Sequence, residues 1–217
     1  MSTESGVATE QVPERAGAAA VADPTIADPG PLGLAAFAAT TFMLSVFNAQ
    51  LMKPAALAAI FLPLALFYGG VAQLLAGMWE FKKANTFGAL AFTSYGAFWI
   101  SLWYVETTIG PKLPLLQAHR AVGLFLLTWT IFTAYMFVAT FRINGALVAV
   151  FGVLLVTFAL LTIGNWGGHA SIIKAGGYFG LLTAALAWYT SFAGLLTQTW
   201  GRVVLPVFPL APGAKAK

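Results

Sequence analysis

Six uncharged, strongly apolar stretches occupy most of this 217-residue chain. They cover residues 32–52, 55–78, 86–105, 121–141, 145–164 and 175–198, and each holds 20 to 24 residues. Because an α-helix rises about 1.5 Å per residue, each stretch is long enough to cross a hydrocarbon core roughly 30 Å thick. The pattern therefore predicts an all-α, polytopic membrane protein with six transmembrane helices per protomer.

The composition supports a single transmembrane domain. Hydrophobic residues make up 59% of the chain and charged residues 8%, whereas a soluble fold carries roughly 25% charged residues. We expect the domain to cover residues 28–206, because no loop between the stretches is long enough for another domain. Residues 1–27 are polar and lack an apolar run, which predicts a disordered tail, and residues 207–217 form a short C-terminal tail.

The distribution of basic residues predicts the orientation in the membrane. An even number of spans puts both chain ends on one side. That side carries Arg15, Lys82, Lys83, Arg142, Arg202, Lys215 and Lys217, and the other side carries Lys53, Lys112, Arg120 and Lys174. By the positive-inside rule, both termini are expected to be cytoplasmic, in the cell membrane. Because these residues flank membrane spans, the net charge of +4 does not indicate a nucleic-acid partner.

A polar stripe follows the first predicted span. Gly33, Phe37, Thr41, Ser45 and Asn48 recur at steps of three or four and therefore share one helix face. Hydrocarbon cannot satisfy hydroxyls or an amide, so this face should meet other helices or water. Two interpretations stay open: hydrogen bonding between helices, or the lining of a pathway.

The second predicted span holds Gln73 midway between Gly69 and Gly77. At this spacing the two glycines let a neighbouring helix come close to the amide. Burying an amide in a membrane is costly unless it is hydrogen-bonded to protein or water. The third span carries the hydroxyls of Thr93, Ser94 and Tyr95 in succession, after Asn85 as a helix cap. We expect at least one of these hydroxyls to reach an interior cavity.

The ionisable residues near the spans suggest no cofactor. His119 and His169 lie in predicted loops and share no helix face, so a haem or metal site is not expected, and the chain has no cysteine. Glu80 and Glu106 fall at span ends, where a solvated position is the expectation. The sequence therefore offers no obvious proton carrier inside the membrane.

Three blocks of sequence resemble the acetate uptake transporter family, also called succinate-acetate permeases. They are PLGLAAFAATTFMLSVFNA (31–49), FYGGVAQLLAGMWEFKKANTFGALAFTSYGAFWISL (67–102), and GLFLLTWTIFTAYMF (123–137) with FALLTIGN (158–165) further on. The resemblance spans residues 28–206. It departs from the family at Asp28, where the signature NPAPLGL has Asn, and this acid adds negative charge near the expected end of a pathway.

The resemblance implies a homohexamer in which each subunit has its own pathway for acetate and related small carboxylates. It also implies a hydrophobic constriction of Phe37, Tyr95 and Leu154. By periodicity alone, Leu154 is an ordinary core leucine, and Gly176, Gly180 and Ala184 form a packing ridge that serves either within or between subunits.

We therefore expect membrane transport of acetate and other small monocarboxylates, with succinate as a further substrate, and no enzymatic activity. Neutral donors are expected to bind the carboxylate, namely Thr41, Ser45, Asn48, Gln73, Thr93 and Ser94. A passive anion channel and a proton-coupled transporter both fit these residues. A membrane-embedded enzyme would need ionisable groups at depth, and a structural membrane protein would not need polar stripes inside its helices.

Overall fold

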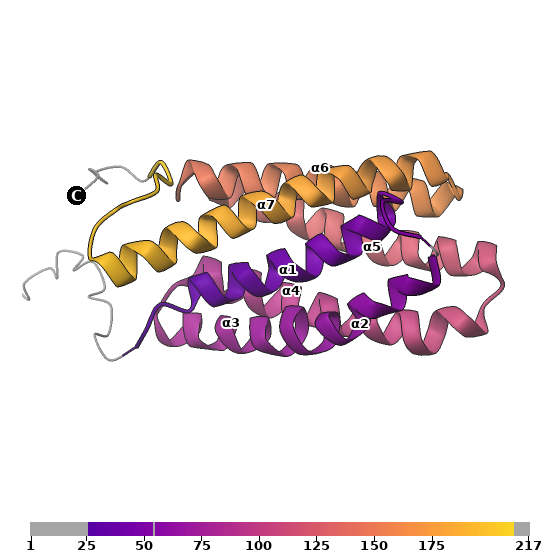
Figure 1. Cartoon of the computed structure of the whole chain (residues 1–217), viewed down its shortest axis with the longest axis horizontal. Coiled ribbons are helices and arrows are strands. Elements are labelled where there is room, and N and C mark those ends of the chain that lie inside the picture. Colours follow the sequence, from indigo (N-terminus) through magenta and orange to yellow (C-terminus); the bar gives the residue numbers. More distant parts are fainter. Residues whose placement is uncertain (1–25, 54, 211–217) are drawn as a thin grey trace, which may run out of the picture.

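The computed structural model describes residues 26–53 and 55–210, except the side chains of residues 55 and 56. Within these residues the protein is a bundle of long helices, which confirms the all-α expectation (Figure 1). The predicted tail 1–27 lies outside the described residues except for its last two positions. Residues 211–217 of the predicted C-terminal tail also lie outside them.

Six helical segments run along the bundle. They are α1 (Gly30–Asn48); a second segment made of η1 (Ala55–Ile60), α2 (Phe61–Leu64), η2 (Ala65–Ala72) and α3 (Gln73–Lys82); α4 (Thr86–Tyr104), continued by η3 (Val105–Ile109) and η4 (Gly110–Lys112); α5 (Leu115–Thr140); α6 (Gly145–Gly167); and α7 (Ala170–Trp200). Five of the six are long and apolar enough to cross a membrane on that criterion alone. The sixth, α4, has 19 residues, and its polar side chains, which include Thr93, Ser94, Tyr95 and Ser101, make it less apolar.

Several helices are longer than the uncharged stretches predict. α3, the fourth and last part of the second span, continues to Lys82 and so includes Glu80. α5 begins at Leu115 rather than at 121, and α7 begins at Ala170 rather than at 175. His119 consequently lies in α5 and not in a loop. The predicted spans were defined as uncharged stretches, so each ends before the nearest charged residue. These three helices continue past that residue into the polar interface of the membrane.

The second span is not the uninterrupted α-helix that its sequence suggested. It begins as a 3₁₀ helix and widens to a π-helix over Ala65–Ala72, which ends directly before Gln73. Gly69 lies in this π-helical part, and a Cβ atom there would meet Thr40 Oγ1 of α1 at 2.5 Å. The close approach therefore requires glycine. π-helical turns occur mostly as interruptions near functional sites.

The glycine ridge on α7 packs inside the subunit. Gly176 faces Leu161 of α6, Gly180 faces Ser45 of α1, and Ala184 is fully buried. α7 thus joins α1 on one side and α6 on the other, and α3 and α4 form a second packed pair (Figure 1). The first and last described segments lie at the same end of the bundle, as an even number of crossings requires.

Candidate transport pathway

Two cavities inside the bundle share two lining side chains. The first has a volume of about 350 Å³ and the second about 110 Å³. Phe37 of α1 and Leu154 of α6 line both cavities, and Tyr95 of α4 lines the first. Two of the three residues predicted to form a constriction therefore border both cavities, and the third borders the first.

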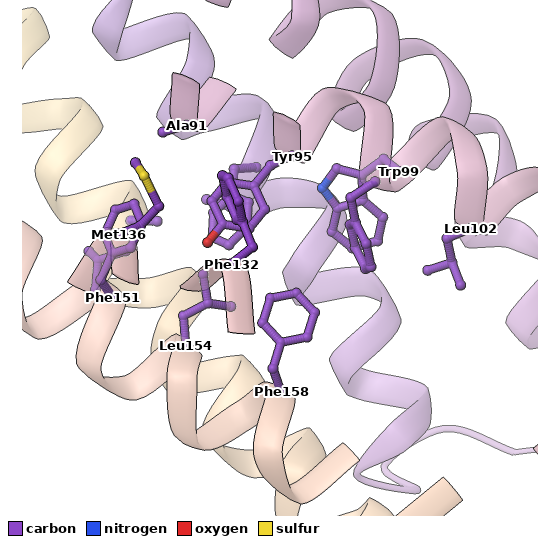
Figure 2. Packing of buried hydrophobic residues seen from close by; sticks show 14 of the residues in the cluster. Ala91, Tyr95, Trp99, Leu102, Phe132, Met136, Phe151, Leu154 and Phe158 are labelled. Atoms are coloured by element: carbon purple, nitrogen blue, oxygen red, sulfur yellow. The ribbon is translucent and has the colours of Figure 1, made fainter. Parts of the chain in front are cut away.

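Phe37, Tyr95 and Leu154 belong to a densely packed, mostly aromatic cluster. Their exposed fractions are 5%, 2% and 3%, and the ring centroids of Phe37 and Tyr95 are 5.5 Å apart. The Tyr95 hydroxyl lies 2.8 Å from Thr133 Oγ1 of α5, which fixes the direction of the ring. Figure 2 shows Leu154 and Phe132 beside Tyr95, with Trp99 and Leu102 on one side and Met136 and Phe151 on the other.

The polar stripe of α1 faces the second cavity. Phe37, Thr41, Ser45 and Asn48 all line it, as expected for residues on one helix face. Thr41 Oγ1 is buried without a hydrogen-bond partner, so its hydroxyl is free to donate to a molecule in the cavity. Gly33, the fifth member of the stripe, instead packs against the ring of Phe92.

Gln73 lines the first cavity. Its side chain is fully buried, and neither its Nε2 nor its Oε1 atom has a hydrogen-bond partner. The flanking glycines act as expected, because Gly69 admits Thr40 and Gly77 admits Thr93 at close range. An unpartnered buried amide costs about 1–3 kcal/mol, so a ligand or water that bonds to it recovers that free energy.

Thr93 and Ser94 do not line either cavity. Thr93 packs at Gly77, where its Oγ1 atom is buried without a partner, and Ser94 is partly buried. Successive helix residues point about 100° apart, so the turn that aims Tyr95 into the first cavity directs its two predecessors elsewhere. The structure therefore places three of the six predicted donors at the second cavity and one, Gln73, at the first.

Trp99 was not identified from the sequence. It lies one turn after Tyr95, lines the second cavity, and has a buried Nε1–H group without a partner. The spacing of four residues on α4 was the available signal, but the aromatic character of Trp99 made it look like an ordinary packing residue.

Glu80 is the main correction to the sequence-based expectation, which placed it in solvent. Its side chain is 1% exposed and lines the first cavity. Asn85 Nδ2 donates a hydrogen bond of 2.8 Å to Glu80 Oε2, while Asn85 Oδ1 accepts from Gly88 N at 3.2 Å as the predicted helix cap. A Cβ atom at Gly88 would lie 2.8 Å from Glu80 Cδ, so glycine provides the space for this carboxyl group.

Asp28 also lines the first cavity, but its charge is paired. Its Oδ1 atom accepts a hydrogen bond of 2.6 Å from Lys83 Nζ and another of 3.0 Å from Gly30 N. The two side chains of the ion pair are 23% and 26% exposed. The acid that departs from the family signature therefore does not stand as an isolated negative charge.

The histidines lie apart from one another. His119 Nδ1 is 3.3 Å from Asn165 Oδ1 of α6, and His169 directly precedes α7. Among residues 26–53 and 55–210, no three His, Cys, Asp or Glu side chains are grouped as metal ligands would be.

A bundle of apolar helices enclosing two cavities, with polar side chains along them and charged side chains at the first, is typical of a multi-pass membrane protein of the transport class. Residues 11–212 match the model of the GPR1/FUN34/yaaH family, and the chain belongs to this family. The family resemblance predicted from the sequence is thereby confirmed.

Named relatives agree with this assignment. The succinate-acetate/proton symporter SatP of Escherichia coli K12 is 45% identical over 184 residues, which are 84% of this chain and 95% of that protein. Acetate permease A of Emericella nidulans is 40% identical over 211 residues, covering 88% of this chain and 70% of that protein. The solved structure of the bacterial acetate channel SatP superposes with a TM-score of 0.78 at 41% identity, covering 84% of this chain and 99% of that one.

Proposed function

We propose that this protein transports acetate and related small carboxylates, with succinate as a further substrate, across the cell membrane through a pathway inside each subunit. The named relatives support this substrate class, because they are described as a succinate-acetate symporter, an acetate permease and an acetate channel. Their descriptions include both proton symport and a channel. The relatives therefore agree on the substrate class and differ on whether transport is coupled to protons.

One observation carries the proposal: Phe37 and Leu154 line both cavities. In this reading, the two cavities are the two halves of one pathway, and Phe37, Tyr95 and Leu154 form the constriction between them. A ring of large apolar side chains excludes water and can close a pathway by dewetting. Small changes in side-chain position then open or close the passage for a molecule as small as acetate.

The proposed donors lie on both sides of this constriction. Thr41, Ser45 and Asn48 serve the second cavity and Gln73 serves the first, where they replace part of the hydration of a carboxylate. Trp99 adds an N–H donor in the second cavity. Thr93 and Ser94 line neither cavity; Thr93 keeps a proposed role as a packing partner of Gly77 in the α3–α4 contact, and Ser94 is assigned no role.

We further propose a homohexamer with cytoplasmic chain ends. The basic residues near the spans favour this orientation, and it would make the first cavity the cytoplasmic one, because Asp28 and Lys83 lie at its edge. The exposed apolar side chains along the helices would then contact lipid or neighbouring subunits.

The test is uptake of radiolabelled acetate into vesicles that contain the purified protein. We expect saturable uptake above that of protein-free vesicles, which measure passive entry of acetic acid. We also expect a strong reduction of uptake in a Phe37→Trp variant, whose larger side chain narrows the passage. Uptake equal to that of protein-free vesicles would contradict the proposed function. It would favour a structural role instead.

A further inference from the structure

We propose that Glu80 binds the proton that accompanies carboxylate transport and passes it to the substrate in the first cavity. This inference rests on the proposed function. Nothing in the relatives' descriptions assigns the proton to a residue, and the sequence alone suggested that no carboxyl group lies deep enough to carry one.

The position of Glu80 is suited to this role. Its side chain is 1% exposed and lines the same cavity as Gln73 and the constriction residues Phe37, Tyr95 and Leu154. Asn85 Nδ2 holds Oε2 at 2.8 Å. The Oε1 atom faces the start of α1, where it would lie 3.6 Å from a Cβ atom at Gly30. Oε2 is therefore held by Asn85, while Oε1 lies at the N-terminal end of α1, the helix that carries Phe37.

The neighbouring charges leave Glu80 without a cation of its own. The charged residues that line the first cavity are Asp28, Glu80 and Lys83. Lys83 Nζ is bound to Asp28 Oδ1 at 2.6 Å, and within the described part of the chain it forms no salt bridge to Glu80. With Glu80 ionised, the three groups have a net charge of −1. With Glu80 protonated, their net charge is zero. A carboxylate anion is repelled in the first case and admitted in the second.

Protonation also changes what Glu80 can bond to. An ionised carboxylate only accepts hydrogen bonds, whereas a carboxylic acid donates one. Protonated Glu80 can therefore donate its O–H to an acetate oxygen, with the Gln73 amide as a second donor in the same cavity. Transfer of this proton breaks the O–H bond of Glu80 and forms the O–H bond of acetic acid, which leaves Glu80 ionised.

The product of this step is suited to the constriction. Acetic acid carries no net charge, and Phe37, Tyr95 and Leu154 offer mainly apolar surface with one hydroxyl that is already bonded to Thr133. Crossing an apolar constriction costs a neutral acid much less than it costs an anion. With the first cavity on the cytoplasmic side, these steps describe export. In uptake they run in reverse: acetic acid crosses the constriction and gives its proton to ionised Glu80, which releases the proton to water. One proton therefore moves with each carboxylate in either direction.

The test compares wild-type and Glu80→Gln protein in vesicles, with the membrane potential clamped. Wild-type protein should show uptake that rises as the external pH falls, and a pH gradient should drive accumulation of labelled acetate beyond that of protein-free vesicles. Glu80→Gln keeps the size and the hydrogen bond to Asn85 but carries no exchangeable acid. We expect its uptake to be at least about tenfold lower and independent of pH, with no accumulation driven by the pH gradient.

Glu106→Gln is the comparison variant at an acid of the other cavity, and only the pH dependence of its uptake is compared, not the rate. Glu106 lines the second cavity, lies past the end of α4, and is exposed in the subunit. This variant should keep the wild-type pH dependence. The inference is overturned if Glu80→Gln retains proton-driven accumulation, or if Glu106→Gln loses it while Glu80→Gln does not.

Two further measurements keep the test decisive. If Glu80→Gln fails to fold, acetate-induced infrared difference spectra of the wild-type protein should show loss of a carboxylic-acid carbonyl band at neutral pH, and the absence of such a band contradicts the proposal. Wild-type vesicles without any saturable acetate uptake would contradict the proposed function itself. Saturable uptake with unaltered coupling in Glu80→Gln contradicts only the role of Glu80.

Discussion

The rings of Phe37 and Tyr95 meet at 5.5 Å between centroids with a tilt of 51°, and the Tyr95 hydroxyl is held by Thr133 on a third helix. This contact joins α1 to α4 through one residue that lines both cavities, Phe37, and one that lines the first, Tyr95. A tyrosine whose hydroxyl is already bonded presents its ring, rather than its polar end, to Phe37. The surface that the two rings present at the proposed constriction is therefore apolar, even though Tyr95 carries a hydroxyl.

Widening the constriction should let larger carboxylates pass. In Phe37→Ala or Leu154→Ala, a large side chain shared by both cavities is removed, so we expect the ratio of succinate to acetate uptake to rise by about tenfold or more. Vesicle uptake of the two labelled acids measures this ratio. Phe42→Ala provides the control, because Phe42 lies on α1 but is 42% exposed and lines neither cavity. An unchanged ratio in both constriction variants would contradict the gate.

Trp99→Phe tests the donor that the sequence did not reveal. The substitution keeps an aromatic ring and removes the Nε1–H group in the second cavity. A hydrogen bond to a charged group contributes about 1.5–3 kcal/mol, so the KM for acetate should rise about tenfold or more with a smaller effect on kcat. Thr128→Val is the control, since the exposed Thr128 hydroxyl bonds only its own helix at Leu124 O. Equal KM values in wild type and Trp99→Phe would exclude a contact with the substrate.

Gln73→Met should raise the stability of the protein and lower its acetate uptake. Methionine has a similar shape but leaves no unpartnered amide, and the wild-type Gln73 amide has no bonding partner in the protein. We therefore expect the thermal unfolding temperature in detergent to rise, with a gain of about 1 kcal/mol, while acetate uptake falls. Gln117→Met on the exposed start of α5 should change neither quantity. Loss of stability in Gln73→Met would show that water or another group already satisfies the amide.

Asp28→Asn restores the residue of the family signature and releases Lys83 from its ion pair. The sum of charges at the first cavity becomes more positive by one, so we expect a lower KM for acetate, by a few-fold at low ionic strength and less at high salt. Lys83→Gln should have the opposite effect, because it leaves Asp28 unpaired. Uptake measured against salt concentration tests both variants, and identical salt dependence in the two would contradict this electrostatic account.

Gly77→Ala should weaken the contact between α3 and α4. A Cβ atom at Gly77 would collide with Thr93 Oγ1 and with the Thr93 backbone, which cannot move aside as a side chain can. Overpacking of this kind costs about 1–3 kcal/mol, and the unfolding temperature measures it. In Gly152→Ala, the nearest atom is a ring carbon of Phe137 at 3.2 Å, so a smaller loss is expected. A greater loss at Gly152 than at Gly77 would contradict this packing argument.

Much of the pathway could be predicted from helical periodicity. The stripe of Phe37, Thr41, Ser45 and Asn48 needed only the repeat of an α-helix, since residues three or four apart share a face. Gln73 was identified by its cost in a membrane and by the glycines beside it. Periodicity does not say which face of α4 points inward, so Thr93 and Ser94 were predicted alongside Tyr95 although only Tyr95 lines the first cavity.

Other features depended on contacts between distant segments. Glu80 follows the last uncharged residue of its span, and a charged residue at that position is normally solvated. It is buried because Gly88 makes room for it, Asn85 bonds it, and the start of α1 covers it. In the π-helical turn before Gln73, Gly69 and Gly70 likewise lie close against Thr40 of α1 and Ile100 of α4.

The sequence by itself determined that the chain crosses a membrane as a helical bundle, because hydrocarbon requires long uncharged segments whose backbone groups are satisfied internally. It also determined the family, through motifs that cover most of the chain. Only the tertiary structure decided that Phe37 and Leu154 separate two cavities and that Glu80 is withdrawn from water. Cavities and burial arise where several helices meet, and no single helix encodes the shape of the space between them.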